Sequence, residues 1–153
     1  MLPRTYDNQV CSIARTLEVM GDRWTALLIR DAFLGRRRFD EYQASLGCAR
    51  NVLADRLARL VDDGILEKHI YNERPERYEY RLTAKGLDLW PVLMTLMKWG
   101  DTYAPTEGGP PVRIVHRDCG GEMTERLTCS LCGEPLEPRL VRAEPGPGAP
   151  VRA

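Results

Sequence analysis

Hydrophobic residues recur at helical spacing along the first part of the chain, and glycines interrupt the pattern. This pattern predicts one helix over Ser12–Met20 and a second over Trp24–Leu34, and a glycine directly follows each. Asp22 can cap the second helix, because its carboxylate can accept hydrogen bonds from the first backbone N–H groups. A third, short helix is expected to open at Asp40, with Gln43 completing a capping box.

A fourth helix is predicted over Asn51–Asp63, and its residues divide between two faces. The apolar face consists of Leu53, Leu57, Leu60 and Val61. The opposite face consists of Asn51, Val52, Asp55 and Arg59, with Arg56 at its margin. One face can therefore be buried while the other presents amide and guanidinium groups, which contact adenine and guanine edges in the DNA major groove.

Two segments rich in Ile, Tyr and Leu follow, Ile65–Tyr71 and Arg77–Leu82, with a polar tip over Asn72–Glu76. Apolar and charged residues alternate in the second segment, which predicts a β-hairpin. A last long helix is expected over Ala84–Tyr103, with Thr83 as its cap.

This last helix is apolar on nearly every side, so it has to be covered on two sides. A homodimer would cover one of them, and the residues proposed for that interface are Trp90, Leu93, Met94 and Met97. A central core helix in a monomer is the alternative. Pro91 lacks a backbone N–H and is expected to kink the helix.

The order of elements predicts a mainly α fold with a small β-hairpin. Specifically, it is typical of a winged helix-turn-helix with a long C-terminal dimerisation helix. The paired Cys and His residues that follow, His116/Cys119 and Cys129/Cys132, add a small zinc-ribbon-like appendage. The expected divisions are a winged helix and dimerisation domain over 1–104, a Pro- and Gly-rich linker over 105–111, and a zinc-ribbon-like segment over 112–136. Five prolines from Pro135 onward leave little to pack, so 137–153 is expected to be a disordered tail.

Composition limits the possible classes of protein. Lys plus Arg and Asp plus Glu are both 22, so the net charge is zero and gives no support of its own for a nucleic-acid partner. Hydrophobic residues make up 43% of the chain, which is enough for a core. With two histidines and no Gly-rich phosphate loop, the chain is not expected to be an enzyme. It shows neither a signal peptide nor an apolar run of about 20 residues, so a cytoplasmic location away from membranes is expected.

Three of the five cysteines lie close together near the C-terminus. The motif His116-x-x-Cys119-Gly is followed by Cys129-x-x-Cys132-Gly. Two residues between ligands allow one tight turn to aim both at a single ion, and the glycine allows the positive φ that such a turn needs. A Cys3His set is typical of structural zinc, so His116, Cys119, Cys129 and Cys132 are candidate ligands, with strands expected over Val112–Val115 and Met123–Thr128. A ribbon that has lost its metal is the alternative.

The first two thirds of the chain, roughly residues 8–104, resemble the HxlR-type winged helix family of bacterial transcription regulators. The motifs that carry the resemblance are Cys11–Leu17, Gly21–Asp31, Arg38–Tyr42, Asn51–Leu57, Asp63–Leu66, Tyr78–Thr83, Lys85–Gly86 and Trp99–Gly100. Two positions depart from the family pattern. Ser12 stands where relatives often have proline, and Ala49 stands where a Ser or Thr cap commonly precedes the recognition helix.

The resemblance implies a homodimeric DNA-binding regulator that responds to a small molecule or to thiol chemistry. The recognition helix would be about 51–63 and the wing about 72–77, on a pseudo-palindromic double-stranded operator. Candidate DNA contacts are Arg36, Arg37, Arg38, Arg50, Asn51, Arg56, Arg59, Arg74 and Arg77. Relatives use a cysteine matching Cys11 as a redox switch, whereas a buried packing role is the alternative.

Two further functions remain open from the sequence. One is a sensor whose chemistry at Cys11, or whose ligand near the tryptophans, releases DNA. The other is a winged helix that docks a protein partner instead of DNA. The operator sequence, the effector, and the choice between repression and activation are not encoded in these patterns.

Overall fold

The computed structural model describes residue 6, residues 12–124 and residues 127–146. The chain forms two compact units, residues 1–87 and residues 88–153. Within the described ranges, no helix combines the length and the apolar character that crossing a membrane requires.

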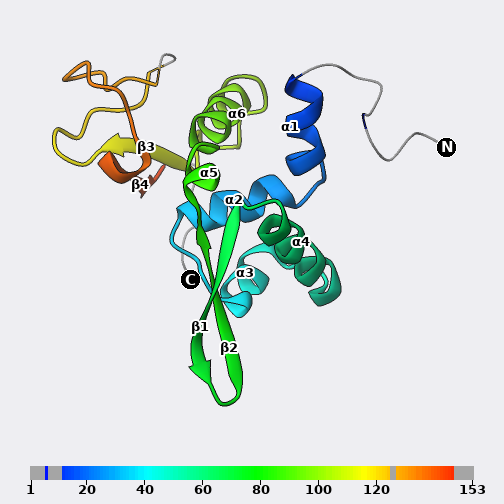
Figure 1. Ribbon diagram of the computed structural model, residues 1–153. Helices are drawn as coiled ribbons and strands as arrows, with labels where there is room; N and C mark the ends of the chain where they lie inside the picture. Colours follow the sequence, from blue (N-terminus) through cyan, green and yellow to red (C-terminus); the bar gives the residue numbers. More distant parts are fainter. Residues whose placement is uncertain (1–5, 7–11, 125–126, 147–153) are drawn as a thin grey trace. The chain divides into compact units, whose positions relative to one another are not determined.

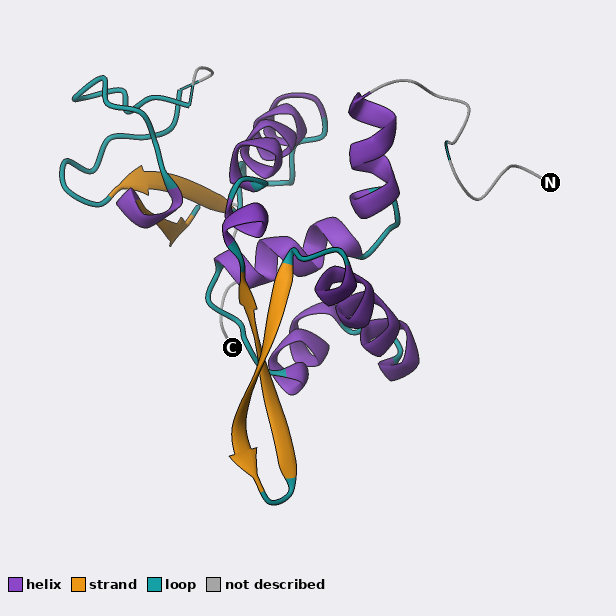
Figure 2. Ribbon diagram, in the orientation of Figure 1, coloured by secondary structure: helices purple, strands orange, loops and turns teal. Residues whose placement is uncertain are grey.

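The first unit is a mainly helical domain with one β-hairpin (Figures 1 and 2). Its elements are α1 (Ser12–Met20), α2 (Thr25–Phe33), α3 (Phe39–Leu46), α4 (Arg50–Asp62), β1 (Leu66–Glu73), β2 (Glu76–Leu82) and α5 (Ala84–Leu87). The strands pair antiparallel from Leu66 opposite Leu82 to Glu73 opposite Glu76. This is the winged helix arrangement that the sequence predicted, with a hairpin tip shorter than expected.

The core of this unit lies where the helices meet the base of the hairpin. Its most deeply buried side chains are Leu28, Ile29, Tyr42, Leu53, Leu57, Leu60, Ile65 and Leu66. They come from α2, α3, α4 and the start of β1, and removing them from water is the main force that holds these elements together. The Tyr42 hydroxyl remains satisfied because it donates to the Arg36 carbonyl, 2.9 Å away.

The start of α3 differs from the prediction. The helix begins at Phe39 rather than Asp40, so Glu41 occupies the third helical position. The Glu41 carboxylate accepts hydrogen bonds from the backbone N–H groups of Arg37 (2.7 Å) and Arg38 (3.0 Å). These two bonds lower the pKa of Glu41. The predicted Asp40–Gln43 capping box is therefore wrong, because the helix starts one residue earlier.

The long helix predicted over Ala84–Tyr103 is two helices, α5 and α6 (Trp90–Tyr103). The cap at Thr83 is confirmed, since its hydroxyl accepts a hydrogen bond from the Gly86 N–H at 3.0 Å. Pro91 lies in the first turn of α6. The expected kink is wrong, because backbone N–H groups in a first turn have no helical partner to lose.

The second unit contains α6 and a small antiparallel sheet of β3 (Val112–His116) and β4 (Val141–Pro145). A 3-10 turn over Pro138–Leu140 leads into β4. The expectation of disorder from residue 137 is thus wrong for residues 138–145. Pairing with β3 supplies the backbone hydrogen bonds that this proline-rich segment could not form locally.

The strand expected over Met123–Thr128 is also not observed among its described residues. Instead, isolated bridges join Val115 to Glu122, Met123 to Cys129 and Thr128 to Pro135. The chain here is organised around the turns of the Cys/His motif rather than around a continuous ladder of strand hydrogen bonds.

Candidate nucleic-acid interface and candidate metal centre

Helix α4 has the two faces that its sequence predicts. Leu53, Leu57 and Leu60 are at most 1% exposed, whereas Asn51, Asp55 and Arg59 are exposed. The apolar side of α4 thus packs into the first unit, and its polar side is open to solvent.

Arg56, at the margin of this polar face, is held inside the unit. Its Nε lies 3.2 Å from Asp22 Oδ1, and its Nη1 lies 3.1 Å from Asp55 Oδ2. Asp22 also accepts hydrogen bonds from the N–H groups of Trp24 (2.8 Å) and Thr25 (3.1 Å), as the predicted cap of α2 requires. One carboxylate therefore joins the start of α2 to the side of α4.

These contacts stabilise the ionised form of Asp22. Burial favours its neutral form, but hydrogen bonds from the Thr25 hydroxyl and from the N–H groups of Trp24 and Thr25 outweigh burial and lower its pKa. The positive charge of Arg56 acts in the same direction. The pair is consequently charged at neutral pH.

A groove of about 380 Å³ lies between the hairpin and the segments that begin α3 and α4. Its lining residues are Arg38, Phe39, Asp40, Arg50, Tyr71, Glu76, Arg77, Tyr78 and Tyr80. Two guanidinium groups lie over aromatic rings in it, Arg38 over Tyr71 at 4.5 Å and Arg50 over Phe39 at 4.7 Å. Stacked guanidinium groups keep their N–H edges free for other partners.

Backbone contacts fix the hairpin beside the start of α3. The Tyr80 N–H donates to the Arg37 carbonyl at 2.8 Å, and Arg38 forms a β-bridge with Glu79. The Arg38 guanidinium also lies 3.6 Å from the Glu79 carboxylate. Arg38 and Arg77, which are 39 positions apart in the sequence, consequently line the same groove.

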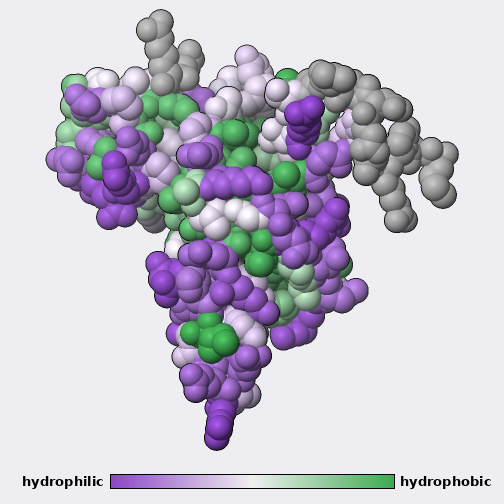
Figure 3. Space-filling model, in the orientation of Figure 1, coloured by the Kyte–Doolittle hydropathy of each residue, from purple (hydrophilic) through white to green (hydrophobic). Residues whose placement is uncertain are grey.

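The predicted DNA-contact arginines differ in how far they are already paired. Arg36 lies 3.7 Å from the buried carboxylate of Asp31, and Arg50 lies 3.6 Å from Asp40. Of the predicted DNA-contact arginines, Arg37, Arg59, Arg74 and Arg77 are exposed and form no ion pair within the described residues. Figure 3 shows hydrophilic side chains covering the far end of the hairpin, where Arg74 lies in the tip.

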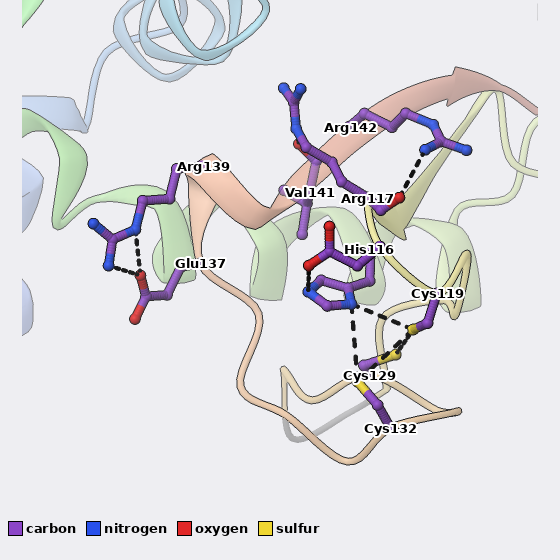
Figure 4. Close-up of polar contacts among 10 residues, drawn as sticks. His116, Arg117, Cys119, Cys129, Cys132, Glu137, Arg139, Val141 and Arg142 are labelled. Carbon is purple, nitrogen blue, oxygen red and sulfur yellow. Dashed lines mark hydrogen bonds and ion pairs between the residues drawn. The ribbon is translucent and has the colours of Figure 1, made fainter.

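The four predicted metal ligands converge in the second unit (Figure 4). Their ligand atoms lie within 4.8 Å of one another. Cys119 Sγ is 3.1 Å from Cys129 Sγ, 3.7 Å from Cys132 Sγ and 3.3 Å from His116 Nδ1. Tetrahedral zinc with Zn–S bonds of about 2.3 Å holds its sulfurs about 3.8 Å apart, so this donor set is of the right size for one ion.

Two matching turns present these ligands. The Gly120 N–H donates to the His116 carbonyl at 2.8 Å, and the Gly133 N–H donates to the Cys129 carbonyl at 3.0 Å. Both glycines have positive φ, 70° and 73°, as the sequence predicted. The two halves of the motif are therefore the same local structure used twice.

Local hydrogen bonds also favour the metal-binding form of one thiol. The pKa of Cys129 is lowered to about 6, chiefly by the backbone N–H of Cys132 and also by the thiol of Cys119. Since metals bind the thiolate, Cys129 is prepared to act as a ligand. The pKa of Cys119 is raised, chiefly because it shares a hydrogen bond with Cys129.

Comparison with known proteins assigns the part of the chain that contains α4 and the hairpin to a family. The HxlR-like helix-turn-helix family model matches residues 19–108. This chain belongs to the HxlR-like helix-turn-helix family. An HTH-type transcriptional regulator of Mycobacterium tuberculosis, Rv3095, is 46% identical over 137 residues, covering 90% of this chain and 87% of the relative. A match of 137 residues in a chain of 153 has to include residues 17–137, and therefore all four candidate ligands.

Solved structures resemble this HxlR-like chain over different lengths. The crystal structure of PA1607, described as a candidate transcription factor, is 39% identical with a TM-score of 0.71 and covers 90% of this chain and 96% of its own. The redox regulator HypR in its reduced form is 28% identical with a TM-score of 0.59, covering 61% of this chain and 94% of its own.

Most of the residues predicted for the dimer interface lie on α6 and are already buried within the single HxlR-like chain. Trp90, Leu93 and Met94 are at most 8% exposed, and Met97 is partly exposed. The exposed apolar residues of α6 are Val92, Leu96, Trp99 and Tyr103. Their spacing of four, three and four residues places them along one stripe of the helix.

The sequence patterns did not predict three features of this HxlR-like chain. The Asp22–Arg56 ion pair joins residues far apart along the chain. Gly121 lies so close to Cys129 that a Cβ on it would be 2.3 Å from the sulfur. Asp118 Oδ2 lies 4.0 Å from His116 Nε2, on the ring edge opposite Nδ1. Only Asp118 could have been noticed in the sequence, because it is a carboxylate inside the His116-x-x-Cys119 motif. Cys11, the predicted redox cysteine, lies outside the described residues.

Proposed function

We propose that this HxlR-like protein is a DNA-binding transcriptional regulator that acts in the cytoplasm. Helix α4 would lie in the major groove of double-stranded DNA, and the hairpin would contact the phosphate backbone. The observation that carries the proposal is the solvent-open polar face of α4 beside an arginine-lined groove. HTH-type regulators among its relatives support the same conclusion.

The exposed side chains suggest a division of roles. Asn51 and Arg59 on α4 carry the groups that contact base edges, while Arg37, Arg74 and Arg77 provide charge for phosphates. Arg38 and Arg50 would contribute through the groove, where their stacked guanidinium groups are already oriented. Arg36 and Arg56 would act mainly by positioning, because Arg36 lies beside the fully buried Asp31 and Arg56 is itself mostly buried against Asp22.

The test separates these roles by their dependence on salt. Genomic DNA fragments that the protein captures supply the operator, and binding is then measured by anisotropy across a salt series. Arg59→Ala should cost about 1–3 kcal/mol on the operator and relax specificity. The double variant Arg74→Ala/Arg77→Ala should weaken binding to all sequences and make the salt slope shallower by about two. Arg15→Ala, on an exposed site of α1, serves as the control. Salt-independent binding would contradict the proposal.

We also propose that His116, Cys119, Cys129 and Cys132 hold a structural zinc ion. The closely spaced donors, the two matching turns and the Cys3His set support zinc, which would cross-link β3 to the turns around Cys129. Protein purified without chelator should contain about one zinc per chain, and Cys129→Ser/Cys132→Ser should contain none. Absence of zinc in the unaltered protein would refute this assignment.

A homodimer is proposed on the exposed stripe of α6, with a second copy as the partner. The 4-3-4 spacing of its apolar residues suits antiparallel or parallel packing against the same helix of another copy. Two recognition helices related by a twofold axis would contact half-sites about one DNA turn, ~34 Å, apart, which predicts a pseudo-palindromic operator.

A thiol-responsive regulator is the second candidate function, because HypR, a solved relative, is described as a redox regulator. In this case oxidation at Cys11 would release DNA. Loss of operator binding after oxidant treatment, abolished by Cys11→Ser, would single out this function.

A further inference from the structure

The four candidate ligands differ in their access to solvent. His116 and Cys129 are 5% and 2% exposed, and they form the inner side of the cluster. Cys119 and Cys132 lie at the surface, and Cys132 is the more exposed of the two. A metal ion in this set would therefore be covered on one side by protein, and its other side would present two sulfur ligands to water.

Cys119 has a second distinction within the cluster. Its sulfur lies 3.1 Å from the sulfur of Cys129 and 3.7 Å from that of Cys132. It is thus a surface sulfur at 3.1 Å from the buried sulfur of Cys129, the position from which a disulfide between the two can form. An oxidising molecule can reach Cys119 from solvent, and a second thiol is already in place to attack it.

We propose that Cys119 is the oxidation site of the metal centre, where two-electron oxidants of the peroxide class begin a reaction that expels the metal. The inference rests on the proposed zinc site. It concerns a different part of the chain from Cys11 and does not depend on chemistry there.

The reaction has two balanced steps. As a metal ligand Cys119 is a thiolate, whatever its pKa in the metal-free protein. This thiolate attacks one oxygen of hydrogen peroxide, and the O–O bond breaks to give a sulfenic acid and hydroxide. The Cys129 thiolate then attacks the Cys119 sulfur, so that an S–S bond forms and the S–O bond breaks, releasing a second hydroxide. Two thiolates are oxidised and one peroxide is reduced. Since a disulfide supplies neither thiolate, only His116 and Cys132 would remain as ligands, and two ligands would not retain the ion.

Local structure favours this route over oxidation of the buried thiol first. A Cβ on Gly121 would lie 2.3 Å from the Cys129 sulfur, which shows how closely the backbone covers that atom. Cys119 precedes the exposed Gly120 in an open turn. The buried sulfur therefore acts as the resolving partner and the exposed one as the point of attack.

The experiment uses the full chain with Cys11→Ser and Cys48→Ala, so that the cluster holds its only thiols. Hydrogen peroxide is added in the presence of a chromogenic chelator, and zinc release is followed with time. A dione that traps sulfenic acid should label Cys119, and peptide mapping without it should find Cys119 joined to Cys129. Cys119→His in this background keeps four ligands, and it should release zinc at least about tenfold more slowly than the matched Cys132→His variant.

Each outcome decides between the two proposals. Zinc that is bound but retained under peroxide, or a Cys129–Cys132 disulfide with Cys119 reduced, would overturn the oxidation site and leave the zinc site intact. Equal release from both histidine variants would overturn the special role of Cys119. An unaltered protein without zinc would refute the metal centre, and the inference with it.

Discussion

Asp22 shows how much one side chain contributes to the placement of α4. Its carboxylate caps α2 through two backbone N–H groups and also lies 3.2 Å from Arg56 on α4. Since a helix cap and an ion pair share the same oxygen, the direction of α2 and the rotation of α4 about its axis are coupled.

Replacing Asp22 with alanine should destabilise the protein by about 0.5–2 kcal/mol, the usual cost of losing a helix cap. The lowered pKa adds a pH dependence. Stabilisation by the ionised carboxylate is complete above the unfolded-state pKa of about 3.9 and is lost as pH falls through the lower folded-state pKa. Denaturant unfolding at pH 7 and pH 3, followed by circular dichroism, should therefore show a smaller difference between the two proteins at pH 3. Asp62→Asn, at an exposed position on α4, is the control, and its difference in unfolding free energy from the unaltered protein should be the same at both pH values.

Gly121 matters because it leaves room for the Cys129 sulfur. Gly121→Ala would place a methyl group 2.3 Å from the Cys129 sulfur, so the ligand has to move. Overpacking of this kind costs about 1–3 kcal/mol, which should weaken zinc binding by about 5- to 150-fold in a chelator competition. Gly100→Ala on α6 is the matched control, because its Cβ would meet no atom within 4 Å. Equal affinities for the two variants would show that the contact is unimportant.

At the level of elements, the β3–β4 sheet depends on chemistry outside itself. The buried hydrophobic residues available to it and its turns are Ile114, Val115, Met123, Leu136 and Val141. Cores of this size rarely hold a fold without a cross-link or a metal. In contrast, the first unit has a core drawn from three helices and the hairpin.

Removal of the metal should therefore unfold the two units unequally. After chelator treatment, amide hydrogen exchange over residues 112–146 should rise by orders of magnitude, while residues 12–87 keep their protection. The measurement is hydrogen exchange by mass spectrometry on the full chain, and Cys129→Ser/Cys132→Ser should behave like the chelated protein without treatment. Unchanged protection of β3 and β4 would show that the sheet is stable on its own.

For the whole molecule, zero net charge is compatible with DNA binding, because phosphate contacts depend on individual basic side chains. The chain has 22 basic and 22 acidic residues, yet Arg37, Arg59, Arg74 and Arg77 remain free of ion pairs in the described part. Binding would therefore depend on local charge, and a second copy would double the number of contacts.

The dimer proposal makes its own prediction at this scale. Leu96→Glu and Trp99→Glu place a charge on the exposed stripe of α6, where these residues are 53% and 61% exposed. Each should convert a dimer to a monomer in sedimentation velocity at micromolar concentration, since burying an unpaired charge is costly. Ile70→Glu alters an equally exposed apolar residue on the hairpin and should leave the dimer intact. A monomeric unaltered protein would rule out this interface.

Local patterns were enough to predict α1, α2, α4 and the hairpin. The helical spacing of Leu53, Leu57 and Leu60 determines which side of α4 is buried, and the glycines after Cys119 and Cys132 determine two tight turns. The predictions were wrong where the same local pattern fits two structures. The cap of α3 depended on a start one residue earlier, and Pro91 could either kink a helix or begin one.

The amino-acid sequence by itself determined the amphipathic helices, the hairpin and the ligand spacing, because these depend on residues a few positions apart. Tertiary structure alone decided the contacts between distant segments. It paired β4 with β3, placed Arg38 beside Tyr71, tied Asp22 to Arg56 and left Cys119 as an exposed sulfur against the buried Cys129. Such contacts follow from how whole elements pack, and a local pattern of residue types does not specify that packing.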